Sequence, residues 1–121
     1  MQNYRQKLGG WGERLAASYL EDKGYTILGR NLRTRFGEID LLARQGEQLV
    51  FVEVKTRRST RYGLPEEAVT GNKKAHLLDA IQAYLQGHPE LPGNYRVDVI
   101  AIFRSPKDRT HEIVQFENAF S

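Results

Sequence analysis

Two short apolar runs near the middle of the chain, at residues 39–43 and 49–54, have the length and composition of β-strands. A Gly-Glu pair at residues 46–47 lies between them. Gly-X is the sequence of a type II′ turn, whose twist matches that of the two strands of a hairpin. The pattern therefore predicts a β-hairpin in which Gln45 faces Gln48.

Acidic residues interrupt this predicted hairpin, which spans residues 36–55. Counting back from the turn places Asp40 opposite Glu53 and Glu38 opposite Lys55. Because strand side chains alternate, all four fall on one face of the hairpin. Carboxylates that face each other across strands repel. A fold that keeps them together is best explained if they hold a cation, with the lysine as a neighbouring positive charge.

The rest of the chain predicts further helices and strands around this hairpin. Apolar residues recur at three- and four-residue steps in two segments, and alternate or cluster in three others. The predicted elements are a helix over 8–23, a strand over 25–34 interrupted at Gly29, a helix over 72–86, a strand over 95–103 and a short edge strand over 112–116. This order predicts one α/β domain over residues 1–121, with a mixed sheet and helices packed on it. The strand at 49–54 is apolar on both faces and is therefore central.

Two acids outside the hairpin lie near the predicted core. Glu13 is at the edge of the apolar stripe of the first helix, where it is either a flanking residue with a solvated tip or a carboxylate directed at the hairpin. Asp98 alternates with Ile100 and Ile102, which predicts an inward, hydrogen-bonded structural residue rather than a catalytic one.

Composition limits the class of protein. The 121 residues contain no cysteine, which excludes disulfides and thiolate metal sites. No stretch approaches the roughly 20 apolar residues of a membrane span, and the N-terminus lacks an apolar signal segment. We therefore expect a soluble, cytoplasmic protein with no membrane partner. Histidines lack ligand spacing, and no phosphate-binding glycine loop is present, so no nucleotide cofactor is indicated.

The formal charge of +3 is modest, but the positive residues are segregated. Basic residues cluster on both sides of the hairpin, and those that follow it include the candidates for nucleic-acid binding: Arg57, Arg58, Arg61, Lys73 and Lys74. Residues 57–68 predict an exposed loop that contacts substrate. Each basic residue alone is better explained as solvated surface, and the two lysines as side chains that extend along the helix. Their clustering favours a polyanionic partner, nucleic acid.

The order of these motifs resembles a known superfamily. Asp40 in GEIDLL, followed by the E-x-K of Glu53, Val54 and Lys55, is similar to the PD-(D/E)XK nucleases. A larger set of residues resembles the bacterial YraN family over residues 10 to 104. It adds Gly12-Glu13, Phe51-Val52, Glu67-Ala68-Val69-Thr70, Lys73 and Arg96-Val97-Asp98-Val99 to this motif. This resemblance implies a restriction-endonuclease-like fold of the branch that contains Holliday-junction resolvases.

The resemblance also implies roles. Asp40, Glu53 and the carbonyl of Val54 would bind Mg²⁺ or Mn²⁺, Lys55 would position or deprotonate the attacking water, and Glu13 would support the metal through water. Lys73 matches a family position in the second helix and is a candidate phosphate contact. Two departures are Ile39, where the motif has its proline, and the additional acid Glu38. Glu38 is open to three roles, which are an ion pair with Lys55, binding of a second ion, or a place at the surface, and we expect the ion pair.

Three interpretations of the sequence follow. The first is a metal-dependent endonuclease that hydrolyses phosphodiester bonds in structured or branched DNA, acting as a monomer or as a homodimer. The second is a nucleic-acid-binding module that keeps the nuclease fold without cutting. The third takes the acids as an ion-paired surface cluster, which requires Asp40, Glu53 and Lys55 to be solvent-facing and spread apart.

Overall fold

The predicted hairpin forms the middle of a mixed β-sheet. A computed structural model of the chain describes residues 4–57, 71–105 and 110–120. The described elements are, in chain order, α1 (Tyr4–Asp22), β1 (Thr26–Thr34), β2 (Gly37–Gln45), β3 (Gln48–Arg57), α2 (Gly71–Gln86), β4 (Tyr95–Arg104) and β5 (His111–Phe116). Every element expected from the sequence is present. The sheet and its helices are α/β, consistent with a restriction-endonuclease-like fold.

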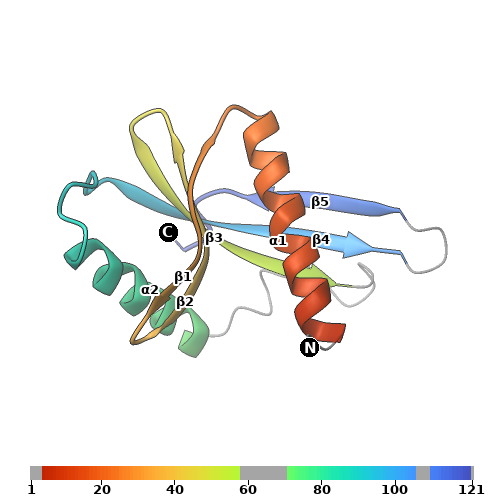
Figure 1. Cartoon of the computed structure of the whole chain (residues 1–121), viewed down its shortest axis with the longest axis horizontal. Coiled ribbons are helices and arrows are strands. Elements are labelled where there is room, and N and C mark those ends of the chain that lie inside the picture. The colour runs from red at the N-terminus through yellow and green to blue at the C-terminus, as the bar shows by residue number, and fades with distance from the viewer. Residues whose placement is uncertain (1–3, 58–70, 106–109, 121) are drawn as a thin grey trace.

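The five strands follow one another across the sheet in the order β1-β2-β3-β4-β5. All neighbours are antiparallel except β3 and β4, which are parallel and are joined through α2. The prediction that the strand at 49–54 is central is confirmed, as is the edge position of the last strand. Figure 1 shows that β1 and β2 cross the direction of β3, β4 and β5.

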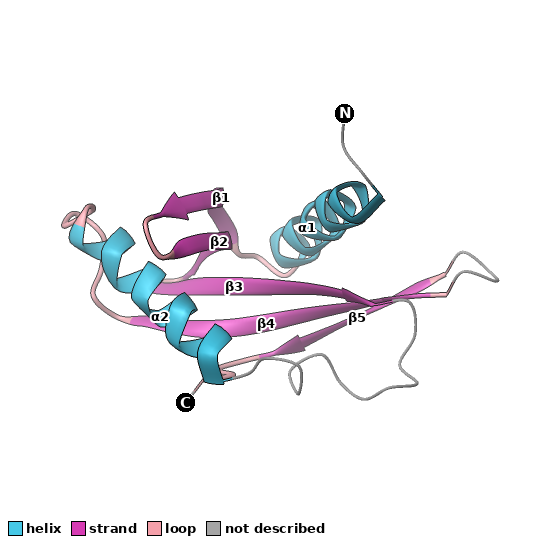
Figure 2. Cartoon of the chain, turned by 90° about the horizontal axis from the view of Figure 1, so that it is seen from below, coloured by secondary structure: helices cyan, strands magenta, loops and turns pink. Residues whose placement is uncertain are grey.

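The two helices cover opposite faces of the sheet (Figure 2). On β3, Val50 and Val52 pack in the cluster that contains the apolar side of α1. The alternate residues Leu49 and Phe51 pack in the cluster that contains Leu77, Ala80 and Ile81 of α2. Period-two alternation on one strand thus sends successive side chains into two cores. This is why β3 is apolar along both faces.

The turn has the conformation that its sequence predicts. Gly46 has φ of 60°, whereas Glu47 is not among the residues with positive φ. A positive φ at only the first turn position is the type II′ pattern. The register is Gln45 to Gln48 at the turn and Leu41 to Val52 at the far end, in agreement with the count from the turn. The ladder ends there, so the predicted cross-strand pairs of Asp40 with Glu53 and of Glu38 with Lys55 are not formed.

Two predictions about the first third of the chain have different outcomes. The irregularity expected at Gly29 is confirmed, because the pairing of β1 with β2 shifts between Ile27 and Gly29. The first helix begins at Tyr4, earlier than the predicted start at residue 8. The glycines at positions 9, 10 and 12, each of which lowers helix propensity by about 1 kcal/mol relative to alanine, lie within this helix.

Asp98 is a structural residue, as its inward position predicts. It is fully buried on β4. Its carboxylate accepts hydrogen bonds from Arg96 Nε at 2.9 Å, from Gln115 Nε2 at 2.8 Å and from the backbone N–H of Asn118 at 3.0 Å. Arg96 Nη2 also donates to the hydroxyl of Tyr25 at 2.7 Å. The network joins β4 to β5 and to the end of α1, because a buried charge requires this many partners.

None of the helices in the described part of the chain is long and apolar enough to cross a membrane.

Candidate active site

The site lies at the open end of the hairpin, where β2 separates from β3. Backbone pairing between these strands ends at Leu41 and Val52. Pairing of β2 with β1 also omits Asp40, because the register passes from Arg30–Leu41 to Leu32–Ile39. Asp40 therefore has no backbone pairing partner in β1 or in β3. Both strands lie wholly within the described residues. The break places its side chain in a gap between strands.

Asp40 uses this gap to bond to the backbone of β3. Its Oδ2 accepts a hydrogen bond from the N–H of Val54 at 2.8 Å. Because the N–H and C=O of one strand residue point to the same side, the Val54 carbonyl also faces the gap. The Asp40 carboxylate and the Val54 carbonyl therefore lie on the same side of β3.

Glu53 and Lys55 flank Val54 on β3 and form an ion pair. Lys55 Nζ lies 2.9 Å from Glu53 Oε1, and the side chains are only 12% and 21% exposed, respectively. The interpretation of Asp40, Glu53 and Lys55 as a dispersed, solvent-facing cluster is therefore wrong. The three residues gather in a half-buried site.

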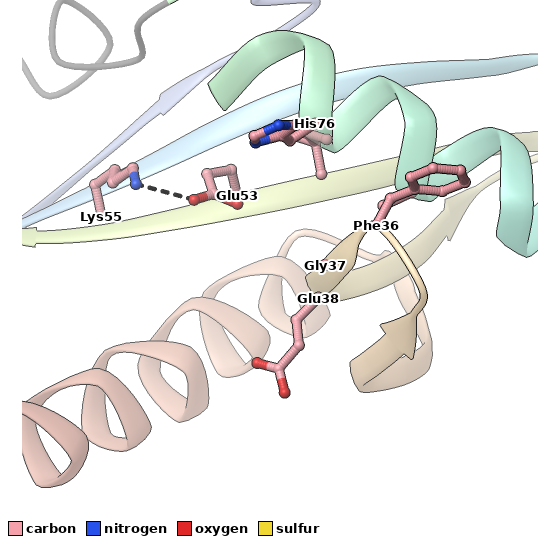
Figure 3. A pocket seen from close by; sticks show the side chains of 8 residues that line it. Phe36, Gly37, Glu38, Glu53, Lys55 and His76 are labelled. Carbon is pink, nitrogen blue, oxygen red and sulfur yellow. Dashed lines mark ion pairs between the residues drawn. The ribbon is translucent and has the colours of Figure 1, made fainter. Parts of the chain in front are cut away.

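Glu38 is not the partner of Lys55, and the predicted ion pair between them is wrong. Glu38 Oε1 accepts a hydrogen bond from Arg33 Nε at 3.0 Å, on the neighbouring strand β1. Figure 3 shows Glu38 pointing away from Lys55 and toward α1. The prediction assumed that the hairpin pairs regularly to its open end. Since β2 leaves β3 before Glu38, the nearest cation is the one on β1.

Glu13 reaches the site from α1 because that helix packs very closely on β3. A Cβ atom on Gly12 would collide with Oγ1 of Thr56, so only glycine allows this approach. The next residue, Glu13, is half-buried. Its carboxylate is close enough to Glu38 and Glu53 for their negative charges to raise its pKa. Of the two positions predicted for Glu13, the structure has the one in which its carboxylate is directed at the hairpin.

Burial dominates the electrostatics of Asp40. Burial first, then the negative charge of Glu53 and a smaller contribution from Glu13, together raise the pKa of this carboxyl from 3.8 to about 7. The Val54 N–H and the positive charge of Lys55 act in the opposite direction. Raised pKa values that arise from burial and like charges are frequent at functional sites. The site holds more negative charge than Lys55 neutralises.

Glu13 is also affected mainly by burial, which raises its pKa. A hydrogen bond from the side chain of Asn31 partly offsets this effect. Asn31 lies on β1 with φ of 51°, in the left-handed region that non-glycine residues rarely occupy. By the register on either side, it is the residue of β1 that faces Asp40. The bend of β1 at Asn31 thus accompanies the break in pairing at Asp40.

The donor atoms fit a hard divalent cation. Asp40, Glu53 and the Val54 carbonyl supply oxygen only, and the excess negative charge around Asp40 is what a cation would neutralise. Within residues 4–57, 71–105 and 110–120, no three His, Asp or Glu side chains are grouped closely enough to hold a metal. Mg²⁺ commonly binds through one or two carboxylates and retains several waters. The set of two carboxylates and one carbonyl fits that mode.

A cleft of about 280 Å³ adjoins the carboxylates of Glu38 and Glu53 on the side of α2. It is bounded by the β1–β2 turn, by β3 and by α2, and its lining includes Glu53, Lys55, His76 and Phe36. Figure 3 shows His76 above Glu53, and Phe36 further along α2. The sequence pattern alone assigns no role in this site to His76 or Phe36. The available signals were an aromatic residue within a turn and a histidine one helical turn after Lys73.

The predicted nucleic-acid-binding residues are only partly described. Arg57 is exposed at the end of β3, next to the site. Arg58, Arg61 and the side chain of Lys73 lie outside the described residues, as do residues 58–68 of the predicted loop. Lys74 Nζ lies 5.4 Å from the ring centroid of Phe120 near the C-terminus. Lys74 therefore contacts a different part of the molecule.

These observations define a restriction-endonuclease-like α/β domain with a half-buried carboxylate and lysine site where two strands separate. Residues 12–102 match the model of a family described as "Uncharacterised protein family UPF0102". The chain belongs to this family, which confirms its resemblance to YraN. A UPF0102 protein of Syntrophomonas wolfei is 49% identical over 95% of this chain and 98% of its own length. One from Syntrophus aciditrophicus is 46% identical over 98% of this chain and 94% of its own.

Proposed function

We propose that this protein is a Mg²⁺- or Mn²⁺-dependent endonuclease that hydrolyses phosphodiester bonds in nucleic acid, with structured or branched DNA as its substrate. The observation that carries the proposal is the half-buried cluster of Asp40, Glu53 and Lys55 at the break between β2 and β3. The residues of this arrangement also form the motif by which the chain resembles PD-(D/E)XK nucleases, and they lie within the family match at residues 12–102.

Asp40, Glu53 and the Val54 carbonyl are the residues that would hold the ion. When bound, a divalent cation neutralises charge that develops on the phosphoryl group and lowers the pKa of a water molecule. The protein contributes the carboxylates, held by a strand gap and a backbone hydrogen bond. Their mutual repulsion without a cation favours binding of one.

Lys55 is placed to act on the attacking water or on the phosphate. Its ammonium is held by Glu53 and has little access to solvent. A lysine so placed orients a water molecule by hydrogen bonding and stabilises negative charge nearby. Glu13, from the opposite face, accepts hydrogen bonds from water at the same site. The basic residues that follow β3 attract the phosphate backbone.

Cleavage assays with a matched pair of variants test this proposal. Junction, flap, nicked and linear DNA, and RNA of the same sequences, are incubated with the protein in Mg²⁺ or Mn²⁺. We expect cleavage of at least one structured DNA, and a loss of about 100-fold or more in Asp40→Asn, as is typical when a group that stabilises the transition state is removed. Glu47→Gln, which removes an exposed carboxylate from the turn of the same hairpin, should leave cleavage unchanged.

The absence of cleavage on all substrates, or equal cleavage by Asp40→Asn, would exclude the nuclease. The second candidate is a nucleic-acid-binding module that does not cut. It is favoured by one observation: within the described residues, no third acidic or histidine side chain completes a metal-binding group. Salt-dependent DNA binding that persists without divalent metal and in Glu53→Gln, together with no cleavage, would establish it.

A further inference from the structure

The cleft beside Glu53 has an apolar wall that the proposed chemistry does not use. Lys55 and the two carboxylates of Glu38 and Glu53 form its polar end. Phe36 together with Leu77 and Ala80 of α2 forms the wall. His76 lies between, near Glu53 (Figure 3). A ligand that fills this cleft needs an apolar part for the wall and, beside it, a polar part that can approach Lys55 and His76.

Phe36 is the most exposed part of that wall. It and Leu28 are the large hydrophobic residues that the described part of the chain exposes, each at 42%. The guanidinium of Arg35 lies 4.8 Å from the centroid of the Phe36 ring. An aromatic ring accompanied by a cation is the combination that binds a nucleobase and its phosphate in single-stranded nucleic acids.

We propose that this cleft is a subsite for one unpaired nucleotide, whose base stacks on Phe36 while its phosphate lies toward His76 and Lys55. The inference rests on the proposed function and specifies its substrate. A base in an intact duplex is stacked between its neighbours and cannot reach Phe36. The scissile phosphate therefore adjoins an unpaired nucleotide, as it does at flaps, gaps and branch points. A volume of about 280 Å³ suits one base rather than a base pair.

Binding measurements with and without the base test the subsite. Two gapped DNAs are prepared that differ only in one unpaired nucleotide, which is either intact or abasic. Their affinities are measured by fluorescence anisotropy in EDTA, so that cleavage does not interfere. Wild-type protein should bind the intact nucleotide roughly tenfold more tightly, the effect of one base–aromatic stack.

Variants then assign that preference to Phe36. Phe36→Ala should bind both DNAs equally, and Phe36→Trp should retain the preference because a larger ring also stacks. Leu28→Ala is the matched control, because Leu28 has the same exposure and does not line the cleft. It should retain the preference. Thermal unfolding of each variant verifies that the fold is intact.

Each result decides a different point. Equal binding of both DNAs by wild type, or a preference that survives in Phe36→Ala, would overturn the subsite and leave the nuclease proposal to the cleavage assay. Failure to bind any of the DNAs would overturn the subsite and again leave the nuclease proposal to the cleavage assay in Mg²⁺ or Mn²⁺. Loss of the preference in Leu28→Ala as well would overturn the assignment to Phe36.

Discussion

Replacing Asp40 by Asn should make the metal-free protein more stable while it removes the proposed activity. The folded state disfavours the Asp40 carboxylate because it is buried beside Glu53, which raises its pKa to about 7. Asparagine has nearly the same shape, and its carbonyl oxygen still accepts the hydrogen bond from the Val54 N–H. The substitution therefore removes the unfavourable charge and keeps the contact.

The size of the gain follows from the pKa. The difference between a pKa of 3.8 and one of about 7 corresponds to at most about 4 kcal/mol of unfolding free energy, at 1.36 kcal/mol for each unit of pKa. Since Asp40 is only partly shielded from water, screening reduces this to about 1–3 kcal/mol. In a domain of this size, 1 kcal/mol changes Tm by roughly 4 °C.

The gain must depend on pH in a defined direction. Between about pH 4 and pH 7 the folded protein binds more protons at Asp40 than the unfolded chain does. Stability therefore falls as pH rises through this window, and the loss is complete above about pH 7. Asp40→Asn should have its full stabilising effect near pH 8 and almost none near about pH 4.

Urea or thermal unfolding in EDTA at both pH values measures this effect. Asp79→Asn, at an exposed position of α2, is the control and should change stability little at either pH. Adding Mg²⁺ near pH 8 should stabilise wild type and not Asp40→Asn, since a ligand of the folded state stabilises it by mass action. A decrease in the stability of Asp40→Asn, or the same increase at both pH values, would refute the inference that ionised Asp40 destabilises the folded state.

Two other substitutions test the framework that holds the site. Gly12→Ala should lower the free energy of unfolding by about 1–3 kcal/mol, because its Cβ collides with Thr56, and should reduce activity by displacing Glu13. Its control is Gly10→Ala, where a Cβ meets only the end of a flexible arginine. In the same urea titration, Gly10→Ala should be neutral or stabilising by up to about 1 kcal/mol. Asp98→Ala should cost about 3–5 kcal/mol, because it leaves the partly buried guanidinium of Arg96 without its main partner. A loss below about 1 kcal/mol in calorimetry would mean that the network adds little to stability.

The sequence alone determined much of the sheet and part of the site. Side-chain alternation and turn conformation depend on residues next to one another in the chain, so the hairpin register was predicted from the Gly46-Glu47 turn. The same local periodicity identified β3 as central and Asp98 as an inward structural residue. The acids and the lysine were found because charged residues are unexpected in an apolar strand.

The tertiary structure decided how that hairpin ends. Pairing stops at Leu41 because β1 and β2 cross the direction of the other strands, and this crossing depends on packing across the whole sheet. Counting residues assumes a regular ladder and therefore assigned Glu38 to the wrong cation. The cleft was equally beyond local pattern, since it forms only where α2 meets the β1–β2 turn. Distances between elements that are remote in sequence are set by how both cores pack, and no spacing in the chain encodes them.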